Sequence, residues 1–292
     1  MNQLHSKGVV ILDFGSQYTQ LIARKVRELN VYSEVLSPDT SLDKIKQCDP
    51  SAIILSGGPS SVFADEAPIF DKNIFNIDIP ILGICYGLQL LAHHHGGSVE
   101  SNGQGEYGFA EINIDDDRKL FQNVSKCSQV WMSHMDRVTK IPEGWHALAH
   151  SSNGVIAAMS NEDQSIVATQ FHPEVSHTEE GKLFLNNFLF KIANCSPNWT
   201  AENFIEEQIE IIRNQVKDDK VIVGVSGGVD STVVAALLHK AIGDQSTAIL
   251  IDHGMLRLNE ANNCVKALKD GLGVNIHCYD ESEIFLKKLE GV

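Results

Sequence analysis

Residues 79–87 read Ile-Pro-Ile-Leu-Gly-Ile-Cys-Tyr-Gly, and a helical pattern follows them from Leu88 to His95. A short apolar run before a helix predicts a buried strand that turns sharply into that helix. Cys85 lies at this turn between Gly83 and Gly87, where a crowded backbone favours the conformational freedom of glycine. The arrangement is typical of a nucleophile elbow, here with cysteine in place of serine.

Strand and helix patterns alternate on both sides of this segment. The predicted strands are residues 9–12, 52–55 and 165–170, and the predicted helices are residues 17–29 and 182–192. Such alternation is typical of parallel strands joined by crossover helices. We therefore predict a first doubly wound α/β domain over residues 1–192.

A cluster of turn-forming residues interrupts this pattern and predicts a linker at residues 193–204. Beyond it, apolar residues recur at helical spacing from Ile205 to Val216, with Thr200 suitably placed as the helix cap. Strand patterns at 221–225 and 248–251 then flank a helical one at 232–241. The predicted fold class is thus α/β, with two doubly wound parallel-sheet domains. The second, residues 205–292, is expected to be incomplete.

The composition argues against several classes of function. Asp and Glu outnumber Lys and Arg by 38 to 23, for a formal net charge of −15, so no nucleic acid partner is expected. No apolar run approaches the roughly 20 residues of a membrane span, and the first residues lack the apolar core of a signal peptide. A cytoplasmic protein without a membrane partner is therefore predicted. Its six scattered cysteines are expected to be free thiols.

The chemistry of a cysteine nucleophile requires a partner histidine. Cys85 is predicted at a helix amino terminus, which favours the thiolate, and a thiolate that attacks an amide needs a proton donor for the leaving ammonia. Of 12 histidines, His172 stands out because Glu174, two residues on, can orient and stabilise its ring. Taken singly, a buried core cysteine and a loop histidine are the commoner interpretations. Their combination in one α/β domain predicts a Cys85–His172–Glu174 triad.

These motifs together resemble the class I glutamine amidotransferase domain of GMP synthetases, over about residues 8–190. The segments that carry the resemblance are residues 11–18, 55–59, 83–87, 131–134 and 172–174. The resemblance implies an oxyanion hole formed by the amides of Gly58 and Tyr86, and glutamine-binding residues Gln89, Ser133, His134 and Asp136. Two positions depart from the family pattern, Met135 in place of glycine and Gly105 in place of arginine. Strain is expected at Met135 if its φ is positive.

A second motif follows the strand at 221–225. Its residues are Ser226, Gly227, Gly228, Val229, Asp230 and Ser231. Amides, glycines and hydroxyls at a helix start can bind an anion, and no lysine is present for a kinase-type phosphate loop. The motif resembles the pyrophosphate loop of ATP pyrophosphatases, which implies ATP binding. Asp230 would then contact the phosphates through Mg²⁺.

Residues 251–260 also resemble the synthetase domain of GMP synthetases. The implied activity is that of a glutamine-hydrolysing carbon–nitrogen ligase in GMP and purine biosynthesis. Glutamine hydrolysis supplies ammonia for ATP-dependent amination of xanthosine monophosphate (XMP), with release of AMP and pyrophosphate. Members of the family carry further synthetase and dimerisation segments. The chain, ending at Val292, is therefore expected to be truncated, and its full-length form is expected to be a homodimer.

Three alternatives stay open on the sequence. One is another amidotransferase that feeds an adenylating domain, such as NAD or asparagine synthetase. Another is a tRNA-thiolating enzyme, which shares the pyrophosphate loop, although the acidic composition and the lack of a catalytic cysteine pair argue against it. The last is a nucleotide-binding regulatory protein without activity, which a glutamine turnover assay would distinguish.

Overall fold

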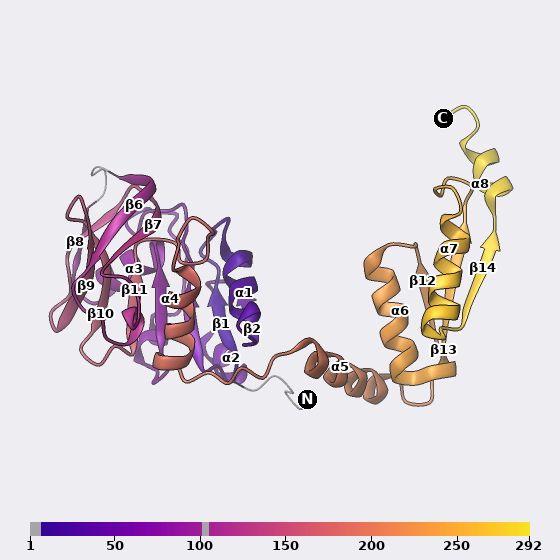
Figure 1. Ribbon diagram of the computed structural model, residues 1–292, viewed down its shortest axis with the longest axis horizontal. Coiled ribbons are helices and arrows are strands. Elements are labelled where there is room, and N and C mark those ends of the chain that lie inside the picture. Colours follow the sequence, from indigo (N-terminus) through magenta and orange to yellow (C-terminus); the bar gives the residue numbers. More distant parts are fainter. Residues whose placement is uncertain (1–6, 101–104) are drawn as a thin grey trace. The chain divides into compact units, whose positions relative to one another are not determined.

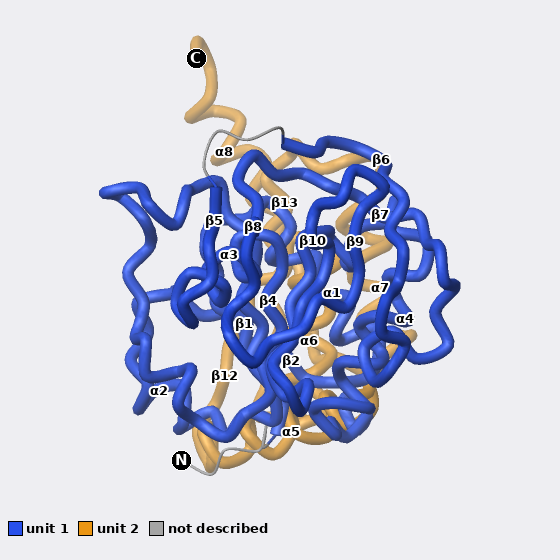
Figure 2. The backbone as a smooth tube through the Cα atoms, turned by 90° about the vertical axis from the view of Figure 1, so that its left-hand side faces the viewer, with its two compact units in different colours: residues 1–199 blue, residues 200–292 orange. Residues whose placement is uncertain are grey.

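The chain divides into two compact units, residues 1–199 and 200–292 (Figures 1 and 2). The computed structural model describes residues 7–100 and 105–292, so residues 1–6 of the first predicted domain lie outside the described residues. The division between the units falls inside the predicted linker at 193–204. Each unit has its own sheet and its own apolar core.

In the described part of unit 1, nine strands form one sheet in the order β2-β1-β3-β4-β11-β10-β9-β6-β7. The first five of these run parallel: β2 (Ser33–Leu36), β1 (Val9–Leu12), β3 (Ala52–Leu55), β4 (Ile81–Ile84) and β11 (Ile166–Thr169). The other four pair antiparallel: β10 (Ile156–Asn161), β9 (Trp145–Ser151), β6 (Glu106–Ile114) and β7 (Cys127–His134). A separate ribbon pairs β5 (Ser98–Glu100) with β8 (Arg137–Lys140).

The α/β class is confirmed, but the sheet of unit 1 is mixed rather than wholly parallel. The central parallel strands β1, β3 and β4 are buried at every position, so they are visible in the sequence as continuous apolar runs. Strand β6 instead alternates exposed and buried residues and contains glycine and glutamate. The parallel strands β1, β3, β4 and β11 were therefore predicted from the sequence, whereas the parallel edge strand β2, which contains serine and glutamate, and the antiparallel strands were not.

Helices cover both faces of the sheet in unit 1, as a doubly wound fold requires (Figure 1). Along β1, Val9 and Ile11 pack with α1 and α4, whereas Val10 and Leu12 pack with α2 and α3. These helices are α1 (Thr19–Glu28), α4 (Gly181–Asn187), α2 (Leu42–Gln47) and α3 (Tyr86–His94). Short 3-10 turns at Lys72–Asn76 and Lys119–Phe121 and a π-helical turn at Phe188–Ile192 complete the described helical segments.

Unit 2 begins with α5 (Ala201–Val216), which is capped as predicted because the Thr200 hydroxyl accepts from the Asn203 amide at 3.2 Å. Three parallel strands follow in the order β12-β13-β14. The remaining elements are β12 (Val221–Val225), α6 (Val229–Ile242), β13 (Ser246–Asp252), α7 (Glu260–Lys266), β14 (Ile276–Asp280) and α8 (Ser282–Leu289). Short turns at Gly243–Gln245 and Ala267–Gly271 extend α6 and α7.

The sheet of unit 2 has helices on one face. Val225 and Leu250 point to a buried cluster with Ala235 of α6 and Ala261 of α7. The opposite face presents apolar side chains to solvent, among them Ile222, Ile251 and Tyr279. Within the described residues, unit 2 is therefore a parallel α/β layer with one apolar face uncovered.

Candidate active site

Cys85 lies where β4 ends and α3 begins. Its backbone has φ 53° and ψ −100°, an unusual conformation for a residue with a side chain, and its N–H donates to the Thr169 carbonyl at 2.7 Å. The helix starts at the next residue, so the sulfur lies at the positive end of the helix dipole. A strained turn of this kind is the geometry that the sequence motif predicted.

The two flanking glycines are needed for space rather than for a left-handed backbone. A side chain at Gly83 would place its Cβ 2.7 Å from the backbone of Gly87, and one at Gly87 would lie 2.6 Å from the Leu55 carbonyl oxygen. Neither glycine has a positive φ. The expectation that glycine supplies the unusual dihedral is therefore wrong: Cys85 carries it, and the glycines allow β3, β4 and α3 to approach one another.

His172 and Glu174 form a buried pair just after β11. The Nδ1–H of His172 donates to Oε1 of Glu174 at 2.7 Å, and the two residues are 3% and 1% exposed. The Thr178 hydroxyl donates to the His172 carbonyl at 2.6 Å, which fixes the turn. The imidazole is thus held in one orientation, with Nε2 free to act on the sulfur of Cys85.

The charge state of His172 follows from its neighbours. Burial by itself favours the neutral ring, but the charge of Glu174 and hydrogen bonds with Cys85 and Glu174 outweigh it and raise the pKa to about 10. An imidazolium at neutral pH can donate a proton. This is the form that a leaving ammonia requires.

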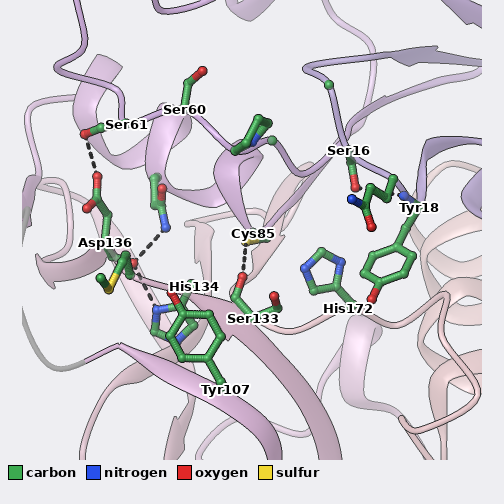
Figure 3. A pocket seen from close by; sticks show the side chains of 16 residues that line it. Ser16, Tyr18, Ser60, Ser61, Cys85, Tyr107, Ser133, His134, Asp136 and His172 are labelled. Carbon is green, nitrogen blue, oxygen red and sulfur yellow. Dashed lines mark hydrogen bonds between the residues drawn. The ribbon is translucent and has the colours of Figure 1, made fainter.

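A cavity of about 500 Å³ opens in front of the sulfur (Figure 3). Seven of the nine residues predicted for glutamine chemistry line it: Gly58, Cys85, Gln89, Ser133, His134, Asp136 and His172. The other two lie behind them. Glu174 contacts the far side of the His172 ring, and the Tyr86 side chain packs against Phe14 on the opposite side of the elbow.

The predicted oxyanion residues differ in how they reach the site. Gly58 lines the cavity, and a Cβ on it would lie 2.5 Å from the Phe14 carbonyl oxygen, so only glycine fits. Tyr86 is the first residue of α3, where a backbone N–H has no intrahelical acceptor. Its amide, rather than its ring, is the group available to an anion at the elbow.

Three of the four predicted glutamine-binding residues form one network, whereas Ser133 lines the cavity and its carbonyl accepts from the Cys85 thiol at 3.6 Å. Gln89 Nε2 donates to the Asp136 carbonyl at 2.8 Å, the His134 ring lies 3.0 Å from the same oxygen, and the Ser61 hydroxyl donates to the Asp136 carboxylate at 2.5 Å (Figure 3). Glu106 lies 3.4 Å from the other side of the His134 ring. Burial, only partly offset by these contacts, lowers the pKa of His134, so its ring is neutral at neutral pH.

The two positions that depart from the family pattern, Gly105 and Met135, lie next to each other in the structure. Met135 has no positive φ, so the strain considered from the sequence is absent there. Gly105 comes so close to this loop that a Cβ would lie 2.4 Å from the His134 carbonyl oxygen and 3.0 Å from the Met135 Cα. A larger residue at 105 would therefore displace the loop that carries the predicted substrate contacts.

Several residues of the site were not predicted from the sequence. The Tyr18 ring meets the His172 ring edge-on at 5.2 Å (Figure 3), and Gly57 is close enough that a Cβ would lie 3.1 Å from that ring. Gly15, Ser16, Gln17, Tyr18, Ser60, Ser61 and Tyr107 also line the cavity. A signal for residues 15–18 was available, because they follow β1 at the carboxyl edge of the parallel strands, where ligands bind in such sheets.

In unit 2, the predicted pyrophosphate loop joins β12 to α6. Gly227 has φ +81°, a conformation that favours glycine, and Gly228 is the cap of the helix. The hydroxyls of Ser226 and Ser231 lie 3.2 Å apart, and the Ser231 hydroxyl also lies 3.1 Å from the Ser226 amide. The loop is therefore a compact turn at the amino end of a long helix.

Asp230 lies exposed in the first turn of α6. Nowhere in residues 7–100 and 105–292 do three or more His, Cys, Asp or Glu side chains converge on a point that could hold a metal ion. A single carboxylate beside hydroxyl groups still suits Mg²⁺, which commonly takes one or two carboxylates and completes its shell with phosphates and waters. A cavity of about 530 Å³ adjoins the loop at Gly227 and Val229.

Comparison with known sequences agrees with this geometry. The sequence model of the family "Glutamine amidotransferase class-I" matches residues 10–192. The chain therefore belongs to the class I glutamine amidotransferase family. The model of a second family, "NAD synthase", matches residues 200–289.

Curated relatives match almost the whole chain. A protein of Wolinella succinogenes named "GMP synthase [glutamine-hydrolyzing]" is 49% identical over 295 residues, which cover 99% of this chain and 57% of that protein. One of the same name from Lactobacillus johnsonii is 50% identical over 97% of this chain and 55% of its own length. The chain thus spans little more than half the length of the relatives it matches.

Among solved structures, a candidate GMP synthase subunit from Thermoplasma acidophilum is similar to this chain with a TM-score of 0.58 and 30% sequence identity. The similarity covers 65% of this chain and 95% of that one. In the described part of the chain, no helix is both long enough and apolar enough to cross a membrane.

Proposed function

We propose that unit 1 hydrolyses glutamine to glutamate and ammonia, with Cys85, His172 and Glu174 as the catalytic triad. The observation that carries this proposal is the contact between a cysteine on a strained elbow and a charged, carboxylate-bound histidine at the wall of one cavity. The family match over residues 10–192 supports it independently.

In the first step, the Cys85 sulfur attacks the side-chain amide carbon of glutamine and a carbon–sulfur bond forms. The carbonyl oxygen becomes an oxyanion near the amides of Gly58 and Tyr86. As the tetrahedral intermediate collapses, the carbon–nitrogen bond breaks and the nitrogen takes a proton from His172. Ammonia leaves, and a glutamyl thioester remains on Cys85.

In the second step, His172, now neutral, accepts a proton from a water molecule that attacks the thioester. The carbon–sulfur bond breaks, the sulfur keeps the electron pair as thiolate, and glutamate leaves. The imidazolium is restored. Glu174 keeps its charge throughout and stabilises the protonated ring.

The hydrogen bonds of Gln89 indicate how the amino acid end of the substrate is held. Within the described residues, its side chain donates through Nε2, with the Asp136 carbonyl and with Gln170 as acceptors. The carbonyl oxygen Oε1 is therefore the group left to face the cavity. An acceptor in that place suits the α-ammonium group of glutamine.

A turnover assay tests the proposal directly. The purified chain is incubated with glutamine, and glutamate and ammonia are measured without ATP. Equal amounts of the two products, made faster than in the absence of protein, are expected. A chain that binds glutamine and releases neither product would contradict the hydrolytic function and favour a regulatory one.

The pH dependence of this activity should change when Glu174 is replaced by glutamine. Glu174→Gln keeps an oxygen that can accept from Nδ1 of His172 but removes the negative charge that most raises the pKa of this histidine. In the wild type the imidazolium persists until the pH approaches about 10. In the variant, we expect kcat/KM to fall at a distinctly lower pH.

The measurement is the pH profile of kcat/KM between about pH 6 and 10, where the position of the alkaline limb reports the acid of the free enzyme. Glu179→Gln is a suitable control, because this nearby carboxylate is exposed. If the alkaline limb lay at the same pH in wild type and Glu174→Gln, Glu174 would not be the group that keeps His172 charged.

For the whole protein, we propose the activity that its curated relatives carry in their name, GMP synthase with hydrolysis of glutamine. Ammonia made in unit 1 would aminate XMP after its activation by ATP, with AMP and pyrophosphate as the other products. Unit 2 would contribute the loop from Ser226 to Ser231 to ATP binding, and Asp230 would help to hold Mg²⁺, which would supply positive charge to offset that of the phosphates. The "NAD synthase" match supports a nucleotide-activating unit, while the relatives that span both units favour XMP as its substrate.

Replacement of Asp230 by asparagine tests the magnesium proposal. Because Asn keeps the shape and loses the charge, Asp230→Asn should weaken binding of ATP in the presence of Mg²⁺ by about tenfold, the loss of one charge-assisted contact. Binding of ATP in EDTA should change little. Isothermal titration calorimetry measures both, with the exposed Asp244→Asn as control. Equal affinities of wild type and Asp230→Asn for ATP with Mg²⁺ would contradict the assignment.

A further inference from the structure

Gln170 directly follows β11, two residues before His172, and is 0% exposed. Among the described residues, its side chain makes two hydrogen-bonding contacts, both with residues that line the cavity. Nε2 lies 3.6 Å from the sulfur of Cys85, and Oε1 lies 3.5 Å from Nε2 of Gln89. A buried amide is costly unless its polar atoms find partners, so these contacts account for how Gln170 can be buried.

The direction of the amide follows from its neighbours. Gln89 presents an NH₂ group, since its Nε2 also donates to the Asp136 carbonyl at 2.8 Å. Gln170 must therefore turn its oxygen toward Gln89, which leaves its own NH₂ group toward the sulfur. An N–H donor at that place favours the charged form of sulfur over the neutral form, because a thiolate is the stronger acceptor.

The backbone of Gln170 does not depend on this side chain. Its N–H donates to the Ala157 carbonyl at 2.8 Å, and the neighbouring Thr169 is paired with both β4 and β10. The strand is thus held by main-chain bonds. The side-chain amide is not needed to hold the strand, so it can contact Cys85 and Gln89 instead.

We propose that Gln170 is a further catalytic residue, whose amide nitrogen stabilises the thiolate of Cys85 while its oxygen anchors Gln89. One chain of hydrogen bonds then runs from the Asp136 carbonyl through Gln89 and Gln170 to the sulfur. It links the wall that binds the amino acid end of the substrate to the nucleophile. This inference rests on the proposed glutaminase function of unit 1.

The test measures ionisation of Cys85 without requiring turnover. The intact chain is alkylated with iodoacetamide over a range of pH, and the rate at Cys85 is followed by mass spectrometry of its peptide, because the chain has five other free cysteines. The variants are Gln170→Met, which removes both polar atoms at similar volume, and Gln170→Glu, which places an oxygen against the sulfur. Gln164→Met is the matched control, since Gln164 is a buried glutamine whose amide contacts Asp116.

In Gln170→Met, the pH at which alkylation of Cys85 is half-maximal should rise by about one unit, and kcat for glutamine should fall about tenfold, as expected for one lost bond to a charged group. Gln170→Glu should shift the midpoint further in the same direction. Gln164→Met should leave the midpoint of Cys85 alkylation unchanged. Thermal melting confirms that each variant is folded.

An alkylation midpoint unchanged from wild type in folded Gln170→Met or Gln170→Glu would overturn the proposal. This result is distinguishable from failure of the glutaminase function. If the wild type releases no glutamate, the proposed function is wrong, yet the alkylation profiles still report whether Gln170 acts on the sulfur.

Discussion

Replacement of Cys85 by alanine should lower the rate of glutamine hydrolysis by at least about 10⁴-fold. Without the sulfur no thioester can form, and water would have to attack an unactivated amide directly. The amides of the oxyanion hole and His172 would remain. They stabilise the tetrahedral intermediate that forms when the sulfur attacks, and this intermediate cannot form in the variant. Release of glutamate, measured under saturating glutamine, reports the effect.

The structure offers a matched control for this variant. Cys127 is exposed on β7 and lines no part of the cavity, so Cys127→Ala should hydrolyse glutamine at the wild-type rate. Because Cys85 carries an unusual φ, circular dichroism should confirm that Cys85→Ala is folded. A folded Cys85→Ala variant that retains more than about a tenth of the wild-type rate would show that another group is the nucleophile.

The predictable parts of the fold are those in which a single physical requirement, such as burial on both faces, decides which residues can occur. Strands β1 and β3 were predicted with the bounds observed, because strands buried on both faces must be apolar throughout. The helix after the elbow was predicted from Leu88 but begins at Tyr86, because the turn is completed within Cys85 alone. Helix starts set by a single strained residue leave no periodic signal.

The antiparallel part of the sheet was not predictable from the same patterns. Tyr107 and Phe109 of β6 are exposed aromatic residues, and Glu106 in the same strand is a buried carboxylate. Glu106 is stabilised there by Ser151 and Asn153, which donate to it from a distant part of the chain. Tertiary contacts of this kind override the simple rule that apolar residues are buried and charged residues exposed.

The candidate site was predictable where a motif fixes local geometry. Cys85 at a strand-to-helix turn, and His172 with Glu174 two residues on, are constrained by neighbours in the sequence, and the structure brings all three together. Gln170 and Tyr18 were missed because their roles come from contacts with residues 85 and 154 positions away. Gln170 immediately precedes the Phe-His-Pro-Glu segment, but nothing in the sequence indicates that its amide reaches the sulfur.

The other large effect is expected for His172. His172→Ala should lower kcat by about 10⁴-fold or more, because the variant loses both the proton donor for ammonia and the base that activates water. Glu174→Gln should lower kcat less than His172→Ala does. The imidazole stays in place in this variant, and only the neighbouring negative charge that keeps it protonated is lost. The exposed His146→Ala is the control and should be as active as wild type.

Chemical rescue separates loss of proton transfer from a change in structure. His172 is almost fully buried against Tyr18 and Glu174, so its removal leaves a space of imidazole size next to the sulfur of Cys85. Added imidazole should therefore restore part of the activity of His172→Ala, and restore none to Cys85→Ala. Glutamate release measured against imidazole concentration gives the result. Wild-type activity in His172→Ala without imidazole would show that the leaving ammonia takes its proton from another group.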